Sequence, residues 1–211
     1  MRDPKRVAIL ISGRGSNMRE LVEQAKDYEV VLVASNKPLA AGLDWARTHG
    51  LPTWTWDSKI VAKEPWDQAL SQALDDHRVG TIALAGFMRI LSPGFIAEWR
   101  GRIVNIHPSL LPAFPGLDTH RRAIEAGCKA SGASVHFVTA ELDHGPIIAQ
   151  ALVPVLADDD EAALSARVLA QEHRLYPRAI GWLVDDRLER RDGIVRHRDG
   201  ASQLLLPEAA R

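Results

Sequence analysis

The 211-residue sequence has little of what marks secreted, membrane or nucleic-acid-binding proteins. Its single cysteine, Cys128, excludes an internal disulfide framework and a zinc site built on several thiolates. Its 26 basic and 27 acidic residues balance, so no charge excess favours a nucleic acid or an anionic membrane surface. The apolar run Val7–Ile11 is too short for a secretory signal, and no run approaches the roughly 20 residues of a membrane span. We therefore expect a soluble, cytoplasmic protein.

Short apolar runs alternate with helix-like segments along the first half of the chain. Buried strands are predicted at residues 7–11, 30–34, 53–56, 81–85 and 102–107, and helices at 18–26, 40–49, 66–77 and 93–99. This alternation indicates right-handed βαβ crossovers and a mostly parallel sheet. After Gly127, β-rich segments at 134–139 and 147–155 predict an antiparallel extension of that sheet. A long helix is expected over 162–184, kinked or split at Pro177.

Length and element order together predict the domain organisation. A chain of 211 residues with 46% apolar content fits one domain with its own core, and no repeat or long linker divides it. The predicted fold is an α/β, Rossmann-like, three-layer single domain over residues 1–211. Within it we expect a phosphate-binding half of about 1–100, a second half of about 101–190, and a peripheral or frayed tail after about 190.

A glycine-rich turn, Gly13-Arg14-Gly15-Ser16-Asn17, joins the first predicted strand to the first predicted helix. Backbone N–H groups and the helix dipole favour an anion such as phosphate there, and the glycines allow it a close approach. Met18 stands where a dinucleotide fingerprint needs a third glycine, and no acid follows the second strand to hold a ribose. No Gly-Lys-Ser/Thr follows either, which excludes a P-loop. The turn is interpreted as a monophosphate site; the alternative is a turn without a ligand.

The stretch RIVNIHPSLLPAFPG, residues 102–116, ends a predicted strand with an amide and an imidazole. Asn105 and His107 are two residues apart and therefore share one face of the strand. The carboxyl edge of an open α/β sheet is where ligands bind, and the prolines that follow force a rigid turned loop. Asn105 with a protonated His107 is the kind of donor pair that a tetrahedral oxyanion requires. The alternative is a polar strand end capped by a proline-rich turn.

Asp143 is the third candidate, in a predicted loop beside Gly145 and Pro146. Its carboxylate could be held against His107, where it would favour the imidazolium and fix the orientation of the ring. No serine or cysteine nucleophile is indicated, so we expect direct attack by a substrate amine. Asp143 could instead only shape the turn. His136 fits a core or supporting role, and the other histidines lack metal-ligand spacing, so no metal site is expected.

Several segments, in order along the chain, resemble one known family: ISGRGSN (11–17), ALAGFMRILSP (83–93), NIHPSLLPAFPGLDTH (105–120), SVHFVTAELDHGPII (134–148) and QEHRLYP (171–177). The sequence resembles the phosphoribosylglycinamide formyltransferases, within the formyl-folate transferase and hydrolase superfamily, over essentially its whole length. The resemblance implies transfer of a formyl group from 10-formyltetrahydrofolate to the amine of glycinamide ribonucleotide in purine synthesis. It implies no metal or redox cofactor, and we expect a monomer or homodimer.

The resemblance also implies roles for the positions that match. Asn105 and His107 would stabilise the formyl oxygen, while Asp143 would keep His107 protonated and assist proton transfer. The substrate's 5′-phosphate and ribose would be held by Gly15, Ser16, Asn17 and Glu172. The second half would bind folate through the backbone of 138–143, and folate would also be bound by Lys63, Met88, Arg89, Ile90, Leu91 and Asn105.

Two positions depart from the family pattern. Lys63 stands where an arginine is expected to contact the folate tail, which leaves that contact open. His144 follows Asp143 where the family often has glycine, which could alter the shape of the loop.

Other functions are weighed against this one. Formylation of initiator tRNA would call for a further C-terminal domain and a basic surface. Hydrolysis of formyl-folate would call for an extra N-terminal domain, whereas the first strand begins at about residue 6. A nucleotide-binding oxidoreductase is disfavoured because the glycine turn lacks the third glycine and no acid follows the second strand to hold a ribose. A non-catalytic phosphate-binding module would not account for Asn105 and His107.

Overall fold

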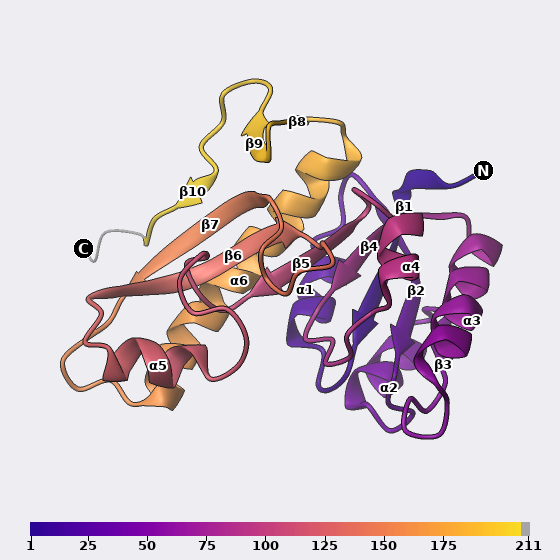
Figure 1. Ribbon diagram of the computed structural model, residues 1–211, viewed down its shortest axis with the longest axis horizontal. Coiled ribbons are helices and arrows are strands. Elements are labelled where there is room, and N and C mark those ends of the chain that lie inside the picture. The colour runs from indigo at the N-terminus through magenta and orange to yellow at the C-terminus, as the bar shows by residue number, and fades with distance from the viewer. Residues whose placement is uncertain (208–211) are drawn as a thin grey trace. The chain divides into compact units, whose positions relative to one another are not determined.

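The computed structural model describes residues 1–207, and it has an α/β fold (Figure 1). The chain forms two compact units, Met1–Asn105 and Ile106–Arg211, with the boundary inside strand β5 (Ile103–His107). The predicted α/β class, with a mostly parallel sheet and antiparallel strands toward the C-terminus, is confirmed. Over the described residues, no helix is long and apolar enough to cross a membrane.

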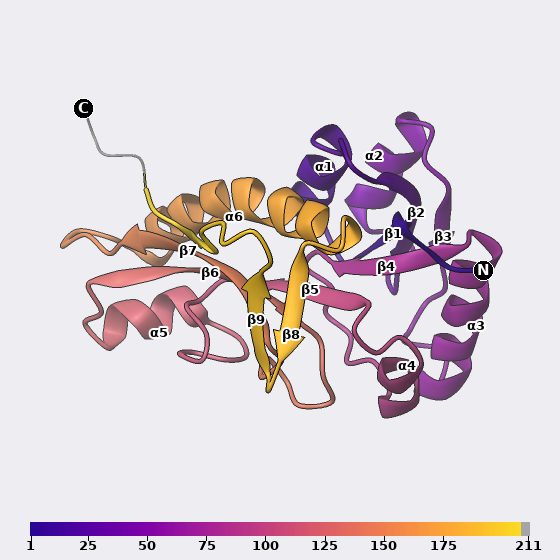
Figure 2. The same ribbon diagram turned by 90° about the horizontal axis from the view of Figure 1, so that it is seen from above.

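The first unit is a parallel sheet covered by helices on both faces. Its strands lie in the order β5-β4-β1-β2-β3, and each neighbouring pair is parallel. The other bounds are β1 (Asp3–Ile11), β2 (Glu29–Ser35), β3 (Thr53–Thr55), β4 (Val79–Leu84), α1 (Ser16–Glu23), α2 (Ala41–Thr48), α3 (Lys63–Asp76) and α4 (Pro93–Glu98). Figure 2 shows α1 and α2 on one side of this sheet and α3 and α4 on the other. Burial on both faces explains why these strands are near-continuous runs of valine, isoleucine, leucine and alanine.

The order of these strands reverses at β1. From β1 the chain proceeds outward through β2 and β3, then returns to place β4 on the other side of β1. Ligands of open α/β sheets bind at such a switch point, outside the carboxyl ends of the strands. The glycine turn that follows β1 and the loop that follows β4 both lie at this point of the first unit.

The second unit is built on an antiparallel strand pair and a long helix. Strands β6 (Ala130–Phe137) and β7 (Ile147–Pro154) are antiparallel, and helix α6 (Glu161–Val184) packs along both of them (Figure 2). Strand β10 (Leu204–Leu205) pairs in parallel with β7, while β8 (Leu188–Arg191) and β9 (Ile194–His197) form a hairpin. The part of the tail that the structure describes therefore contains paired strands rather than a frayed end.

Two features of this unit differ from the prediction. Helix α6 continues through Pro177, so the predicted split is wrong. Nine other residues of α6 are buried along with Pro177, and the packing of this buried face stabilises the helix across the proline. Helix α5 (Thr119–Glu125) was not predicted, because its seven residues are too few for a clear apolar period. Its N-cap, Asp118, has a left-handed conformation, with φ of 57°, and its side chain makes no capping hydrogen bond.

Close backbone approach makes Gly132 in β6 a sensitive position. A Cβ added there would lie 1.8 Å from the carbonyl oxygen of Ala151 in β7. We expect Gly132→Ala to lower the free energy of unfolding by about 3 kcal/mol, because backbone cannot yield as a side chain can. Gly94→Ala is the control, since its Cβ would meet only Ser92 Oγ at 3.9 Å. Urea unfolding of both variants tests this, and equal stabilities would contradict it.

An ion pair fixes the segment that enters α6. Asp159 accepts hydrogen bonds from Arg167 Nη1 at 2.6 Å and Nη2 at 2.8 Å, and from the Leu156 N–H at 2.8 Å. These donors, Arg167 first, lower the pKa of Asp159 to about 2. Because the folded pKa lies below the ordinary 3.8, this stabilisation is complete above that value and is lost as the pH falls toward 2.

The expected consequence is a difference in acid sensitivity. The native protein should lose more stability between about pH 4 and pH 2 than Asp159→Asn, which has no carboxylate to protonate. Unfolding by urea at several pH values in this range measures it. Asp44→Asn, which breaks an exposed pair with Arg47, serves as the control and should follow the native curve. Parallel curves for native and Asp159→Asn proteins would contradict the assignment.

Candidate active site

The glycine turn after β1 has a backbone that only glycine adopts readily. Gly15 is the N-cap of α1 and has φ of 75°, and its Cβ would also lie 3.4 Å from Gly42 Cα in α2. The Gly42 N–H donates to the Gly13 carbonyl at 3.1 Å, which ties the turn to the start of α2. Ser16 and Asn17 are the first residues of α1, where backbone N–H groups have no partner within the helix. This geometry suits an anion at the end of β1.

Ser12 connects the loops that surround this turn. Its hydroxyl donates to Asn36 Oδ1 at 2.5 Å and accepts from the Met88 N–H at 2.8 Å. The hydroxyl is buried and lies at the carboxyl end of β1. The loops after β2 and β4 are therefore held next to the glycine turn within the first unit.

The residues of the first unit that are expected to bind folate differ in the exposure and the contacts of their side chains. Met88 and Ile90 expose 64% and 67% of their surface, whereas Leu91 is buried in the core. The Arg89 guanidinium donates to the Ser58 carbonyl at 3.0 Å and lies 5.1 Å from the Trp66 ring. Lys63 is the first residue of α3. Two apolar side chains are thus free to meet a ligand, while Leu91 has a packing role in this structure.

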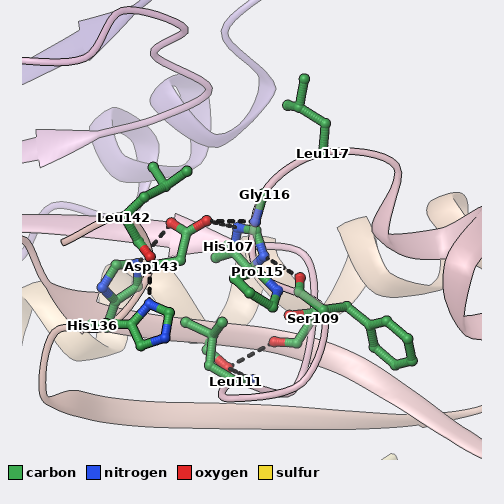
Figure 3. Close-up of polar contacts among 12 residues, drawn as sticks. His107, Ser109, Leu111, Pro115, Gly116, Leu117, His136, Leu142 and Asp143 are labelled. Carbon is green, nitrogen blue, oxygen red and sulfur yellow. Dashed lines mark hydrogen bonds and ion pairs between the residues drawn. The ribbon is translucent and has the colours of Figure 1, made fainter.

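Strand β5 carries Asn105 and His107 as its third and fifth residues, on one face as the alternation requires. His107 is buried, and an acceptor lies near each nitrogen of its ring (Figure 3). Nδ1 is 3.5 Å from Asp143 Oδ2, and Nε2 is 3.0 Å from the carbonyl oxygen of Phe114. Because a carbonyl only accepts, Nε2 carries a proton, and a proton on Nδ1 as well would make the ring an imidazolium. The sequence alone could not show that His107 and Asp143 meet.

Asp143 lies among groups from β5, β6 and the proline-rich loop. Its side chain is 7% exposed, and Oδ2 accepts a hydrogen bond from the Gly116 N–H at 2.9 Å. Its other oxygen, Oδ1, is 3.7 Å from Nε2 of His136 (Figure 3). Asp143 itself has φ of 55°, in the left-handed region. One carboxylate therefore connects two histidines and the proline-rich loop.

His136 was expected only as a core or supporting residue, and the structure places it against Asp143. It is buried in β6, and its Nδ1 donates to the Phe137 carbonyl at 2.9 Å. Burial lowers the pKa of His136, and this is partly offset by that hydrogen bond and by the Asp143 charge. A neutral ring with its proton on Nδ1 turns an unprotonated Nε2 toward Asp143.

Ser134 lies two residues before His136 and so on the same face of β6. Its hydroxyl donates to the Ser109 carbonyl at 2.7 Å and accepts from the Leu111 N–H at 3.0 Å. The Leu111-Pro112 bond, whose isomer the sequence left open, is cis. The alternation of Ser134 and His136 along a strand was the available signal for both residues, and it points to a polar face that supports the site.

The remaining predicted residue, Glu172, is buried on α6 of the second unit. His120 in α5 is partly buried, and this burial lowers its pKa against the opposing charge of Glu161. Among residues 1–207 no group of three or more histidine, cysteine or acidic side chains is arranged to hold a metal ion.

These features define a class: an α/β enzyme whose candidate site holds a buried imidazole against a carboxylate. Residues 5–180 match the family described as formyl transferase, and the chain belongs to that family. It is 47% identical over 188 residues to the phosphoribosylglycinamide formyltransferase of Escherichia coli (strain K12), covering 87% of this chain and 89% of that protein. It is 50% identical over 188 residues, 86% of this chain, to the trifunctional purine biosynthetic protein adenosine-3 of Drosophila melanogaster, of which it spans 14%.

Solved structures show the same relationship. The crystal structure of phosphoribosylglycinamide formyltransferase from Anaplasma phagocytophilum matches with a TM-score of 0.91 and 39% identity, covering 99% of this chain and 100% of that one. A formyltetrahydrofolate deformylase from Pseudomonas syringae matches with a TM-score of 0.83 and 28% identity, covering 92% of this chain and 65% of that one.

Proposed function

We propose that this protein transfers the formyl group of 10-formyltetrahydrofolate to the amine of glycinamide ribonucleotide. The products are formylglycinamide ribonucleotide and tetrahydrofolate, in the de novo synthesis of purines. The observation that carries the proposal is the buried contact between His107 and Asp143, 3.5 Å apart, in which His107 lies on the strand that also carries Asn105. The names of the relatives at 47% and 50% identity support the choice of substrates.

The chemistry needs orientation and charge stabilisation, because the formyl group is already activated on nitrogen. The substrate amine attacks the formyl carbon, and the formyl oxygen becomes negative as a tetrahedral intermediate forms. Asn105 donates a hydrogen bond to that oxygen, and so does His107, whose Nε2–H exchanges the Phe114 carbonyl for the formyl oxygen while the Asp143 charge holds the imidazolium through Nδ1. Asp143 assists removal of a proton from the attacking nitrogen. The bond from carbon to the folate nitrogen then breaks, and that nitrogen takes up the proton.

The two compact units offer different binding groups. In the first unit, Gly15, Ser16 and Asn17 would hold the 5′-phosphate, and Met88 and Ile90 would pack against the folate. In the second, Glu172 would bind the ribose and the backbone of 138–143 would bind the pterin. We further propose a cytoplasmic location and a monomer or homodimer.

Hydrolysis of 10-formyltetrahydrofolate is a second candidate, favoured by the similarity to the Pseudomonas syringae deformylase. A single assay separates the two: release of tetrahydrofolate is followed with and without glycinamide ribonucleotide. We expect release only when the ribonucleotide is present. Equal release without it would identify a hydrolase, and no release in either case would leave a phosphate-binding α/β protein.

A further inference from the structure

The loop that joins β6 to β7 is closed at its neck. The Phe137 N–H donates to the Pro146 carbonyl at 2.9 Å, and a Cβ on Gly145 would lie 1.7 Å from the Phe137 oxygen. The backbone therefore approaches itself so closely that only glycine fits at 145. Within the neck, the Thr139 hydroxyl donates to the Glu141 carbonyl at 3.1 Å. Residues 138–144 form a tip that carries Asp143, and this tip has few internal restraints of its own.

His144 supplies one such restraint. Its Nδ1 donates to the Leu142 carbonyl at 2.6 Å, so a hydrogen bond spans Asp143 from one side of it to the other. Its Nε2 lies 3.9 Å from Glu141 Oε1. The imidazole thus links the residues on the N-terminal side of Asp143 to the residue that follows it. Because the His144 side chain is 47% exposed, core packing does not account for its placement.

The hydrogen bond from His144 to Leu142 restrains the backbone of Asp143, which has an unfavourable conformation. Asp143 has φ of 55°, a conformation that residues other than glycine seldom adopt. In this conformation Asp143 can reach both the Gly116 N–H and His107. A glycine at 144 would provide no side chain to hold the turn and would add backbone freedom on both sides of it.

We propose that His144 is a positioning residue that holds the tip of the β6–β7 loop ready for formyl-folate. By fixing the Leu142 carbonyl beside Asp143, it reduces the ordering that the loop must undergo when folate binds. The proposal rests on the proposed function, in which the backbone of 138–143 contacts the pterin. It predicts an effect mainly on the KM for formyl-folate, because His144 does not meet the reacting atoms.

Three substitutions at this position separate the hydrogen bond from the bulk of the side chain. The side-chain nitrogen of asparagine lies where Nδ1 of histidine does, whereas that of glutamine lies where Nε2 does. We expect His144→Gly and His144→Gln to raise the KM for 10-formyltetrahydrofolate about five- to tenfold with kcat within twofold. His144→Asn should stay within twofold of the native KM. A native KM in His144→Gly, or equal defects in the asparagine and glutamine variants, would overturn the proposal.

Hydrogen–deuterium exchange of the amides of residues 138–145 tests the positioning without any assay of activity. In the native protein and in His144→Asn these amides should exchange slowly, and in His144→Gly and His144→Gln at least several-fold faster. Exchange in His144→Gly at the native rate would overturn the positioning role. If the native protein showed no transfer dependent on the ribonucleotide, the proposed function would fail, and the exchange rates would still decide whether His144 holds the loop.

Discussion

Replacement of His107 by alanine is expected to lower kcat for formyl transfer by about 10²–10³-fold, equivalent to roughly 3–4 kcal/mol of transition-state stabilisation. The imidazole is buried and held by Asp143 through Nδ1, so in our proposal only Nε2–H changes partner, from the Phe114 carbonyl to the oxyanion. A donor held in place in this way loses little in reorganising as the oxyanion forms. Steady-state kinetics at saturating concentrations of both substrates measure the effect.

The His107→Ala protein should still bind glycinamide ribonucleotide. In our proposal the glycine turn after β1, which is built from residues of the first unit alone, holds the phosphate. Isothermal titration with the ribonucleotide, and thermal unfolding as a check on the fold, provide the controls. Turnover at the native rate would contradict the catalytic role of His107, and loss of ribonucleotide binding would place it in the substrate site instead.

The second large effect is expected for Asp143→Asn. Asparagine keeps the shape of the side chain and can still accept from the Gly116 N–H through its amide oxygen, but it brings no charge to His107 or His136. The imidazolium form of His107 loses its counter-charge, and the proton acceptor is lost as well. We expect kcat to fall by about 10²-fold or more, with the KM of either substrate changed little.

The retained shape makes Asp143→Asn its own control for loop structure. Exchange of the amides in the β6–β7 loop should remain close to native, which would separate loss of charge from collapse of the loop. A change confined to KM would contradict a role for Asp143 in the chemical step. Asp143→Ala removes the Gly116 contact as well and should show both effects together.

Features that depend on neighbouring residues could be predicted from the sequence, whereas features that depend on tertiary packing could not. The buried strands β1 and β5, with their runs of aliphatic residues, follow from pattern alone, as does the N-cap of α4, where the Ser92 hydroxyl accepts from Phe95. Asn105 and His107 could be placed on one face because the alternation of a strand is fixed. The contact of His107 with Asp143, 36 positions further on, comes from tertiary packing and has no local signature.

Other features could not be predicted because they too depend on tertiary packing. The Phe114 carbonyl faces His107 because Phe114 has φ of 53°, and nothing in an alanine-phenylalanine-proline run predicts a left-handed residue. Helix α6 continues through Pro177 because burial of its apolar face outweighs a lost hydrogen bond, which propensity alone does not weigh. The role of His136 needed the position of Asp143 to be known.

The closed neck of the β6–β7 loop separates the loop residues other than Asp143 from the strands on either side. One backbone hydrogen bond from Phe137 and one obligatory glycine at 145 join its ends, whereas the register of β6 with β7 is set by pairs further along both strands. Changes of length or composition between the two ends are therefore insulated from the sheet. A protein built this way can vary the surface that meets its ligand while the strands that carry the site keep their alignment.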